Sequence, residues 1–120
     1  MSYSADHGFF ARLASANDGF ASGLPATFDR LAQLGGTLDP AAPAATAEEL
    51  QAMLHTVAGS AVTFGYRGMG QHARALEQRL LVLMAFESVA ARDWSTWLGE
   101  LGDFVEAGRR DPKALSESIS

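Results

Sequence analysis

The chain has 120 residues, of which 48% are hydrophobic and 19% charged, and this profile is typical of one globular domain with its own core. The formal charge of −5 disfavours nucleic-acid binding, which normally requires a basic patch or stripe. The absence of cysteine excludes thiol catalysis, thiolate metal sites and disulfides. Without an apolar run of roughly 18 residues or a signal-peptide pattern, we expect a cytoplasmic protein with no membrane segment.

The first third of the chain predicts a helix after a lead-in. Residues 20–34 carry apolar side chains at helical spacing, and Gly35-Gly36 is expected to end this helix. Pro25 lies inside the pattern and predicts either a kink or the start of a new helix. Residues 1–19 change from polar to apolar and have room for a short helix. The apolar residues of this lead-in are Phe9, Phe10 and Leu13.

A second helix follows a connecting loop predicted over residues 39–45. Thr46 and Glu49 match the Thr-x-x-Glu capping box that marks a helix start. Gly65 is well placed to end the helix after Phe64. At about 100° per residue, six apolar residues gather on one face, which we assign to the core. They are Leu50, Met53, Leu54, Val57, Ala61 and Phe64.

Two more helices are predicted in the second half of the chain. The third covers residues 67–86, with a buried stripe of Met69, Ala73, Leu76, Leu80, Leu83 and Met84. Ser88 or Asp93 is expected to cap the fourth, which Arg109-Arg110 and then Asp111-Pro112 would end. Its apolar residues are Trp94, Trp97, Leu98, Leu101, Phe104 and Val105.

These stretches predict an all-α fold, because no segment alternates with the period of a strand. The expected architecture is an antiparallel four-helix bundle with short loops and room for a short N-terminal helix. We expect residues 1–120 to form a single domain whose ends, 1–8 and 113–120, are frayed.

His55 stands out on the second helix. It falls about 150° from the centre of the apolar stripe, which predicts an exposed ring. The other outward positions are small or apolar instead of the usual Glu, Lys, Gln and Arg; they are Ala52, Ala58, Gly59 and, in part, Val62. Gly59 costs a helix about 1 kcal/mol relative to alanine, which is accepted where something approaches the backbone closely. Packing against a second subunit or another part of this chain would also explain such a face.

Several kinds of histidine chemistry are disfavoured at this position. Imidazole acts near neutral pH as a base, a metal ligand or a nucleophile. A metal site lacks ligands, because Glu48 and Gln51 are near but no His or Asp stands at 51, 52, 58 or 59. Ser60 is turned away from His55, and a convex helix face offers no pocket for acid–base catalysis. A nucleophilic imidazole presented to another protein's active site remains.

The segment Leu54-His-Thr-Val-Ala-Gly-Ser-Ala-Val-Thr-Phe-Gly65 resembles the signature of histidine-containing phosphotransfer (HPt) domains. The family pattern is His, any residue, an aliphatic, Lys, Gly, then Ser or Ala, with a further Gly closing the helix. The residues that match are His55, Val57, Gly59, Ser60, Ala61 and Gly65. A weaker resemblance extends to Leu24-Pro25 and to Ala73-Arg-Ala-Leu-Glu77.

This resemblance implies a monomeric intermediate of a two-component phosphorelay. His55 would be the phosphoacceptor, taking a phosphoryl group from a receiver-domain aspartyl phosphate and passing it to another response regulator. A hybrid sensor histidine kinase would stand upstream. The resemblance implies no ATP site, metal or cofactor in this chain, because the receiver supplies Mg²⁺. The implied partner-binding residues are Glu48, Gln51, Ala52, Ala58, Gly59 and Val62.

One residue departs from the family pattern, because Ala58 stands where the pattern has lysine. A lysine one turn from the ring would favour the negatively charged phosphoryl group, and Arg67, Arg74 or Arg79 is a candidate substitute. Three hypotheses stay open. They are an active relay, a degenerate HPt-like adaptor that binds receivers without efficient transfer, and a helical interaction or dimerisation protein without signalling chemistry.

The remaining candidates predict structural roles. We expect His7 on the surface, and His72 at the edge of the third helix's apolar stripe as a hydrogen-bonding residue. Trp94 and Trp97 are expected in the core. Gly65-x-x-Gly68-x-Gly70 follows a helix and lacks the Gly-Lys-Ser/Thr of a P-loop, so we interpret it as a turn between helices.

Overall fold

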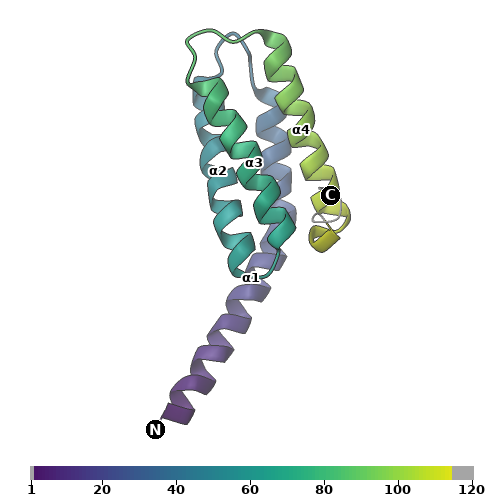
Figure 1. Ribbon diagram of the computed structural model, residues 1–120. Helices are drawn as coiled ribbons and strands as arrows, with labels where there is room; N and C mark the ends of the chain where they lie inside the picture. The colour runs from purple at the N-terminus through teal and green to yellow at the C-terminus, as the bar shows by residue number, and fades with distance from the viewer. Residues whose placement is uncertain (1, 115–120) are drawn as a thin grey trace.

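The computed structural model describes residues 2–114, with side chains over residues 8–113. Four helices pack side by side, neighbours in sequence running antiparallel (Figure 1). They are α1 Ser2–Thr37, α2 Ala44–Thr63, α3 Arg67–Met84 and α4 Ala91–Arg110, with a 3₁₀ turn at Pro112–Ala114. The described residues contain no strand, which confirms the predicted all-α four-helix bundle, and none of their helices combines the length and apolarity that crossing a membrane requires.

The core lies between the helices and uses the predicted apolar stripes. On α2 the buried members of the stripe are Leu50, Leu54, Val57 and Ala61, while Met53 and Phe64 are only partly buried. Trp94 and Trp97 are buried on α4, and Trp97 donates a hydrogen bond from Nε1 to the carbonyl of Leu76 at 3.0 Å. The predicted core role of the two tryptophans is therefore confirmed.

Helix α1 is longer and more continuous than predicted. It includes residues 2–19, where only a short helix was expected, and it runs through Pro25 without a break. Pro25 deprives the carbonyl of Ala21 of its helical donor, but both residues are exposed, so water can bond that carbonyl. The helix also continues past Gly35-Gly36 to Thr37. Residues 115–120 of the expected C-terminal tail lie outside the described part of the chain.

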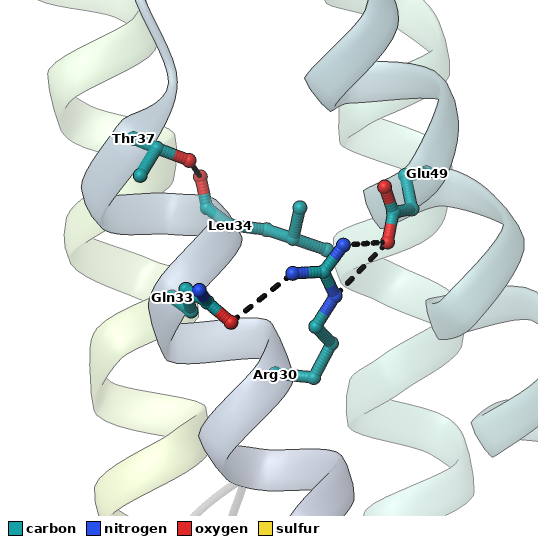
Figure 2. A network of polar contacts seen from close by, with 5 residues as sticks. All are labelled: Arg30, Gln33, Leu34, Thr37 and Glu49. Carbon is teal, nitrogen blue, oxygen red and sulfur yellow. Dashed lines mark hydrogen bonds and ion pairs between the residues drawn. The ribbon is translucent and has the colours of Figure 1, made fainter.

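The predicted N-caps of α2 and α4 are wrong. Helix α2 begins at Ala44 after Pro43, and no side chain caps it. Glu49 instead accepts a hydrogen bond from Arg30 Nε at 3.0 Å, which joins α2 to α1 (Figure 2). Helix α4 begins at Ala91 without a side-chain cap, and Asp93 lies in its first turn, where a negative charge complements the helix dipole.

The turn between α2 and α3 fixes the two helices against each other. Gly65 has φ +88°, a left-handed conformation that favours glycine. The N–H groups of Gly65 and Tyr66 bond the carbonyls of Val62 and Ala61 at 3.3 and 2.7 Å, which is a Schellman C-cap. The predicted end of the second helix is confirmed. Of the glycines assigned to this turn, only Gly65 lies in it, because Gly68 and Gly70 are buried within α3.

Candidate functional site

The structure exposes His55 on the outer surface of α2. Its side chain is 75% solvent-accessible, whereas Leu54 beside it is fully buried. The helical period that places Leu54 in the core turns the next residue outward. The predicted exposure of His55 is therefore confirmed.

A glutamate from α3 holds the His55 ring. Glu77 Oε2 lies 3.0 Å from His55 Nδ1 and accepts a hydrogen bond from Gln51 Nε2 at 2.7 Å. The Glu77 side chain is only 11% exposed, so its carboxylate has little conformational freedom. Gln51 and His55 lie one turn apart on α2 and meet one carboxylate oxygen from the neighbouring helix.

This contact determines which ring nitrogen is available for chemistry. A carboxylate accepts hydrogen bonds but donates none, so Nδ1 of His55 carries the proton that Glu77 accepts. In the neutral ring the lone pair then resides on Nε2. A nucleophile held by a base or orienting group in this way is the arrangement required for covalent group transfer. With Nδ1 engaged by Glu77, Nε2 is the ring nitrogen left to bond another group.

The residues predicted to bind a partner are accessible around His55, except for one of them. Glu48, Ala52, Gly59 and Val62 are exposed, and Gln51 is half-buried. Above Gly59 the space is open, because a Cβ added there would meet nothing within 4 Å.

Ala58 is 3% exposed, so its predicted outward position is wrong. The cause is the close approach of α3, where a Cβ added at Gly70 would lie 3.1 Å from the carbonyl oxygen of Ala58 and 2.6 Å from Val62 Cγ2. Helix α3 therefore covers the position at which the family pattern has lysine.

The three arginines considered as substitutes for that lysine differ in their surroundings. Arg79 pairs with Glu100 of α4 at 2.6 Å and is thus engaged on the far side of α3. Arg67 and Arg74 are exposed on α3. Arg74 lies three residues before Glu77 and so occupies the same face, one turn away. Among the three, only Arg74 lies both on this face of α3 and within one turn of the residue that contacts His55.

His72 lies half-buried at the edge of the α3 stripe, as predicted. Its ring meets Phe104 edge-on with 5.3 Å between centroids, and its Nδ1 has no hydrogen-bond partner among the described residues. The predicted hydrogen-bonding role is therefore not seen at this nitrogen. Burial, assisted by the charge of Arg79, lowers the pKa of His72 below its ordinary value. The side chain of His7 lies outside the described residues.

The described side chains do not form a metal site. No group of three or more His, Asp or Glu residues in the described part of the chain is arranged to hold a metal ion.

The fold is a four-helix bundle, and its candidate site is an exposed histidine that contacts a carboxylate of the neighbouring helix. Residues 20–110 match the Hpt domain family, and the chain belongs to this family. Membership implies a phosphotransfer role in a phosphorelay and interaction with receiver domains of two-component systems. Neither the comparison with curated proteins nor the comparison with solved structures finds a match.

The sequence did not reveal the contact between Glu77 and His55. The two residues are 22 positions apart on different helices, and helical periodicity relates only residues within one helix. The available signal was a carboxylate directly after Leu76, at the border of a stripe that is otherwise apolar. Buried glutamates are rare unless they are paired, so such a residue predicts a polar partner without naming it.

Proposed function

We propose that the chain is a phosphorelay intermediate in which His55 accepts a phosphoryl group from an aspartyl phosphate of one receiver domain and passes it to the aspartate of another. The contact between Glu77 and His55 Nδ1 at 3.0 Å carries this proposal. It directs an exposed Nε2 outward, where a receiver's active site can reach it.

The transfer step balances in atoms and charge, and it needs few groups from this chain. Nε2 attacks the phosphorus atom in line, the P–O bond to the receiver's aspartate breaks, and the aspartate leaves as a carboxylate. The ring gains positive charge as the N–P bond forms, and the Glu77 carboxylate stabilises it through the retained Nδ1 proton. Transfer onward is the same step in reverse with a second receiver. The receiver supplies Mg²⁺ and most of the remaining electrostatics.

The receiver docks over the outer face of α2. Ala52 and Gly59 flank His55 with small side chains, so the rim of a receiver's active site can approach the imidazole closely. Val62 adds exposed apolar area, being 55% accessible. Glu48 and Gln51 lie toward the N-terminal end of the same face and provide polar contacts at its rim. The phosphoryl donor is the receiver of a hybrid sensor histidine kinase, and the acceptor is a response regulator.

Arg74 supplies the positive charge that lysine supplies in the family pattern. It lies on α3 one turn from Glu77 and on the same face, it is exposed, and Arg79 is occupied by Glu100 at 2.6 Å. Arginine can bind phosphoryl oxygens with two parallel N–H donors. A cation from the neighbouring helix therefore replaces one from α2, whose equivalent position is covered.

A second candidate function is an adaptor that binds receivers without efficient transfer. The observation that favours it is Ala58, which is both uncharged and 3% exposed. The adaptor would use the same docking face and differ only in the chemistry at His55. Phosphate transfer therefore distinguishes the two functions, whereas binding does not.

Incubation with a phosphorylated receiver domain tests the proposal. Label is expected on the wild-type chain in an acid-labile, alkali-stable form, and it is expected to be absent from His55→Gln. His72→Gln is the matched control and should take label normally. If the chain binds a phosphorylated receiver but takes no label from it, the relay is refuted in favour of the adaptor.

A further inference from the structure

The N-terminal half of α1 extends beyond the bundle. Helix α1 has 36 residues, compared with 18 to 20 in the other helices, and its purple end projects away from them (Figure 1). The projecting part has large apolar side chains in solvent, with Phe9 54%, Phe10 64% and Leu13 43% exposed. An unsupported helix of this length is only marginally stable in water. The match to the Hpt family begins at residue 20, so this extension adds to the family domain.

One line of residues joins the extension to the bundle. Starting at Phe9, positions separated alternately by four and three residues lie on one side of α1, which is the spacing of a coiled-coil seam. The seam consists of Phe9, Leu13, Ala16, Phe20, Gly23 and Thr27. Phe9 and Leu13 at its start are large and Gly23 and Thr27 at its end are smaller, while in the middle Ala16 is small and Phe20 is large. Phe20 packs on Phe64 with 5.4 Å between ring centroids.

The end of the seam that carries small residues borders a groove between α1 and α2. The groove has a volume of about 410 Å³ and is lined by apolar and small side chains, among them Gly23, Thr27, Ala52 and Met53. A Cβ added at Gly23 would meet nothing within 4 Å. The groove can therefore accept large apolar side chains, and those of the extension stand on the same side of the same helix.

We propose that the groove binds the N-terminal extension of a second copy of this chain, in an antiparallel two-fold dimer. When the seams of two copies run antiparallel and cross at residue 18, each large residue lies opposite a small one of the other copy. Phe9 meets Thr27, Leu13 meets Gly23, and Phe20 meets Ala16. These pairs follow from a single register, and the two-fold axis fills both grooves with the same contacts.

This complementarity identifies a second copy as the occupant. The large side chains and the small positions that receive them lie on the same seam of one sequence. The register that pairs them also places a positions opposite d positions, as in antiparallel coiled coils. The dimer also covers the exposed apolar face of the extension, which lies in line with the part of α1 that packs in the core. The newly buried side chains are chiefly Phe9 and Leu13 of both copies, on the order of 500 Å². The interface is therefore small and the dimer weak.

The groove of the proposed dimer lies beside the phosphoacceptor proposed above but does not include it. His55 does not line the groove, and on α2 it lies about 120° from the groove side, so a receiver can still reach it. Ala52 is the residue that the groove shares with the proposed receiver surface. Dimerisation replaces the monomer that the family resemblance implies with a pair whose bundles point in opposite directions.

Sedimentation equilibrium of the full chain up to about 100 μM tests the dimer. Gly23→Leu is expected to raise the dissociation constant at least about tenfold, because the new side chain meets Leu13 of the other copy. It has room in the monomer and improves helix propensity, so folding is preserved. Leu13→Ala combined with Gly23→Leu exchanges the large and small partners and should restore association. Phe86→Ser removes a ring that is 64% exposed elsewhere and should change nothing.

Cysteine crosslinking tests the register, since the chain contains no cysteine. A mixture of Leu13→Cys and Gly23→Cys chains should form a mixed disulfide under mild oxidation, while a mixture of Leu13→Cys and Phe86→Cys chains should not. A chain that stays monomeric at every concentration overturns the proposal, as does a dimer insensitive to Gly23→Leu. A monomer whose affinity for a receiver falls in Gly23→Leu would assign the groove to the receiver instead.

Discussion

At the scale of single residues, the site depends on the carboxylate that meets the histidine. Glu77 reaches Nδ1 of His55 and Nε2 of Gln51 with the same oxygen, so it joins two residues of α2 from α3. The contact is charge-assisted through the carboxylate and becomes stronger once the ring is cationic. In the transfer we propose, this carboxylate orients Nε2 and stabilises the charge that develops on the ring.

Removing this carboxylate should slow transfer without abolishing it. Glu77→Ala is expected to reduce the rate of labelling of His55 about tenfold, which corresponds to the loss of one hydrogen bond to a charged group. Glu77→Gln should lose less, because its amide oxygen can still accept from Nδ1. Nitrogen-15 NMR should show the Nδ1–H tautomer in the wild type and a mixture of tautomers in Glu77→Ala.

The matched control for this change is Glu106→Gln, which alters an exposed glutamate that pairs with Arg109 and lies away from His55. An unchanged tautomer and rate in Glu77→Ala would mean that the 3.0 Å contact has no functional role.

The positive charge assigned to Arg74 makes a separate prediction. Arg74→Gln should lower the rate of transfer from a phosphorylated receiver roughly tenfold, the effect of losing one charge-assisted contact to the phosphoryl group. Arg67→Gln and Arg79→Gln should leave the rate near that of the wild type. If the three variants behave alike, the effect is one of net charge, and Arg74 has no particular place in the site.

At the scale of the helices, the close packing of α2 and α3 is what brings Glu77 to His55. Gly70 permits it, since a Cβ at this position would lie 2.6 Å from Val62 Cγ2 and 3.1 Å from the carbonyl oxygen of Ala58. A side-chain methyl can move, but a backbone carbonyl within a helix moves only with the helix. The separation of the two helices therefore depends on this glycine.

Gly70→Ala should destabilise the bundle by about 1–3 kcal/mol through overpacking, measured as the free energy of unfolding in urea. Trimming the movable neighbour in Val62→Ala/Gly70→Ala should recover part of the loss. Gly99→Ala serves as the control, because its Cβ would meet nothing within 4 Å, and it should stabilise the helix by up to about 1 kcal/mol. Equal stabilisation by both alanines would contradict the close-packing account.

At the scale of the whole molecule, stability should depend on the protonation of His72. Burial and Arg79 lower its pKa in the folded state below the ordinary 6.5, while Glu100 and Asp103 nearby act in the opposite direction. The unfolded chain therefore binds this proton more readily than the folded chain. The contribution of His72 to stability is complete above the unfolded pKa and is lost as the pH falls toward the lowered folded pKa.

Urea unfolding at several values between about pH 7.5 and pH 5 checks this prediction. As the pH is lowered, the free energy of unfolding should decrease more steeply in the wild type than in His72→Gln. Measuring both chains with His55→Gln in the background removes the second described histidine from the comparison. Parallel pH profiles would show that His72 titrates alike in the folded and unfolded chains.

Features that depend on the geometry of a single helix could be predicted from the sequence. The apolar stripe of α2 was enough to place Leu54 in the core and His55 outside it, since both follow from 3.6 residues per turn. The end of α2 at Gly65 was also predicted, because Gly65 follows the last apolar position. Each of these features is local, and local backbone geometry determines it.

Features that depend on two helices could not be predicted in the same way. Ala58 is buried because α3 approaches at Gly70, and Glu77 reaches His55 from another helix. The capping box failed for a similar reason, since Glu49 binds Arg30 of α1 at 3.0 Å instead of the N-terminal turn of its own helix. Such contacts depend on how the helices pack, and no period within one helix encodes that packing.

The central claim is that Nε2 of His55 carries a phosphoryl group received from a receiver domain. Phosphorus-31 NMR of the chain after incubation with a phosphorylated receiver tests it most directly, because the two phosphohistidine isomers give separate resonances. The Nε2 isomer is expected, and it should be absent from His55→Gln. A phosphoryl group on Nδ1, or none at all from a receiver that binds the chain, would contradict it.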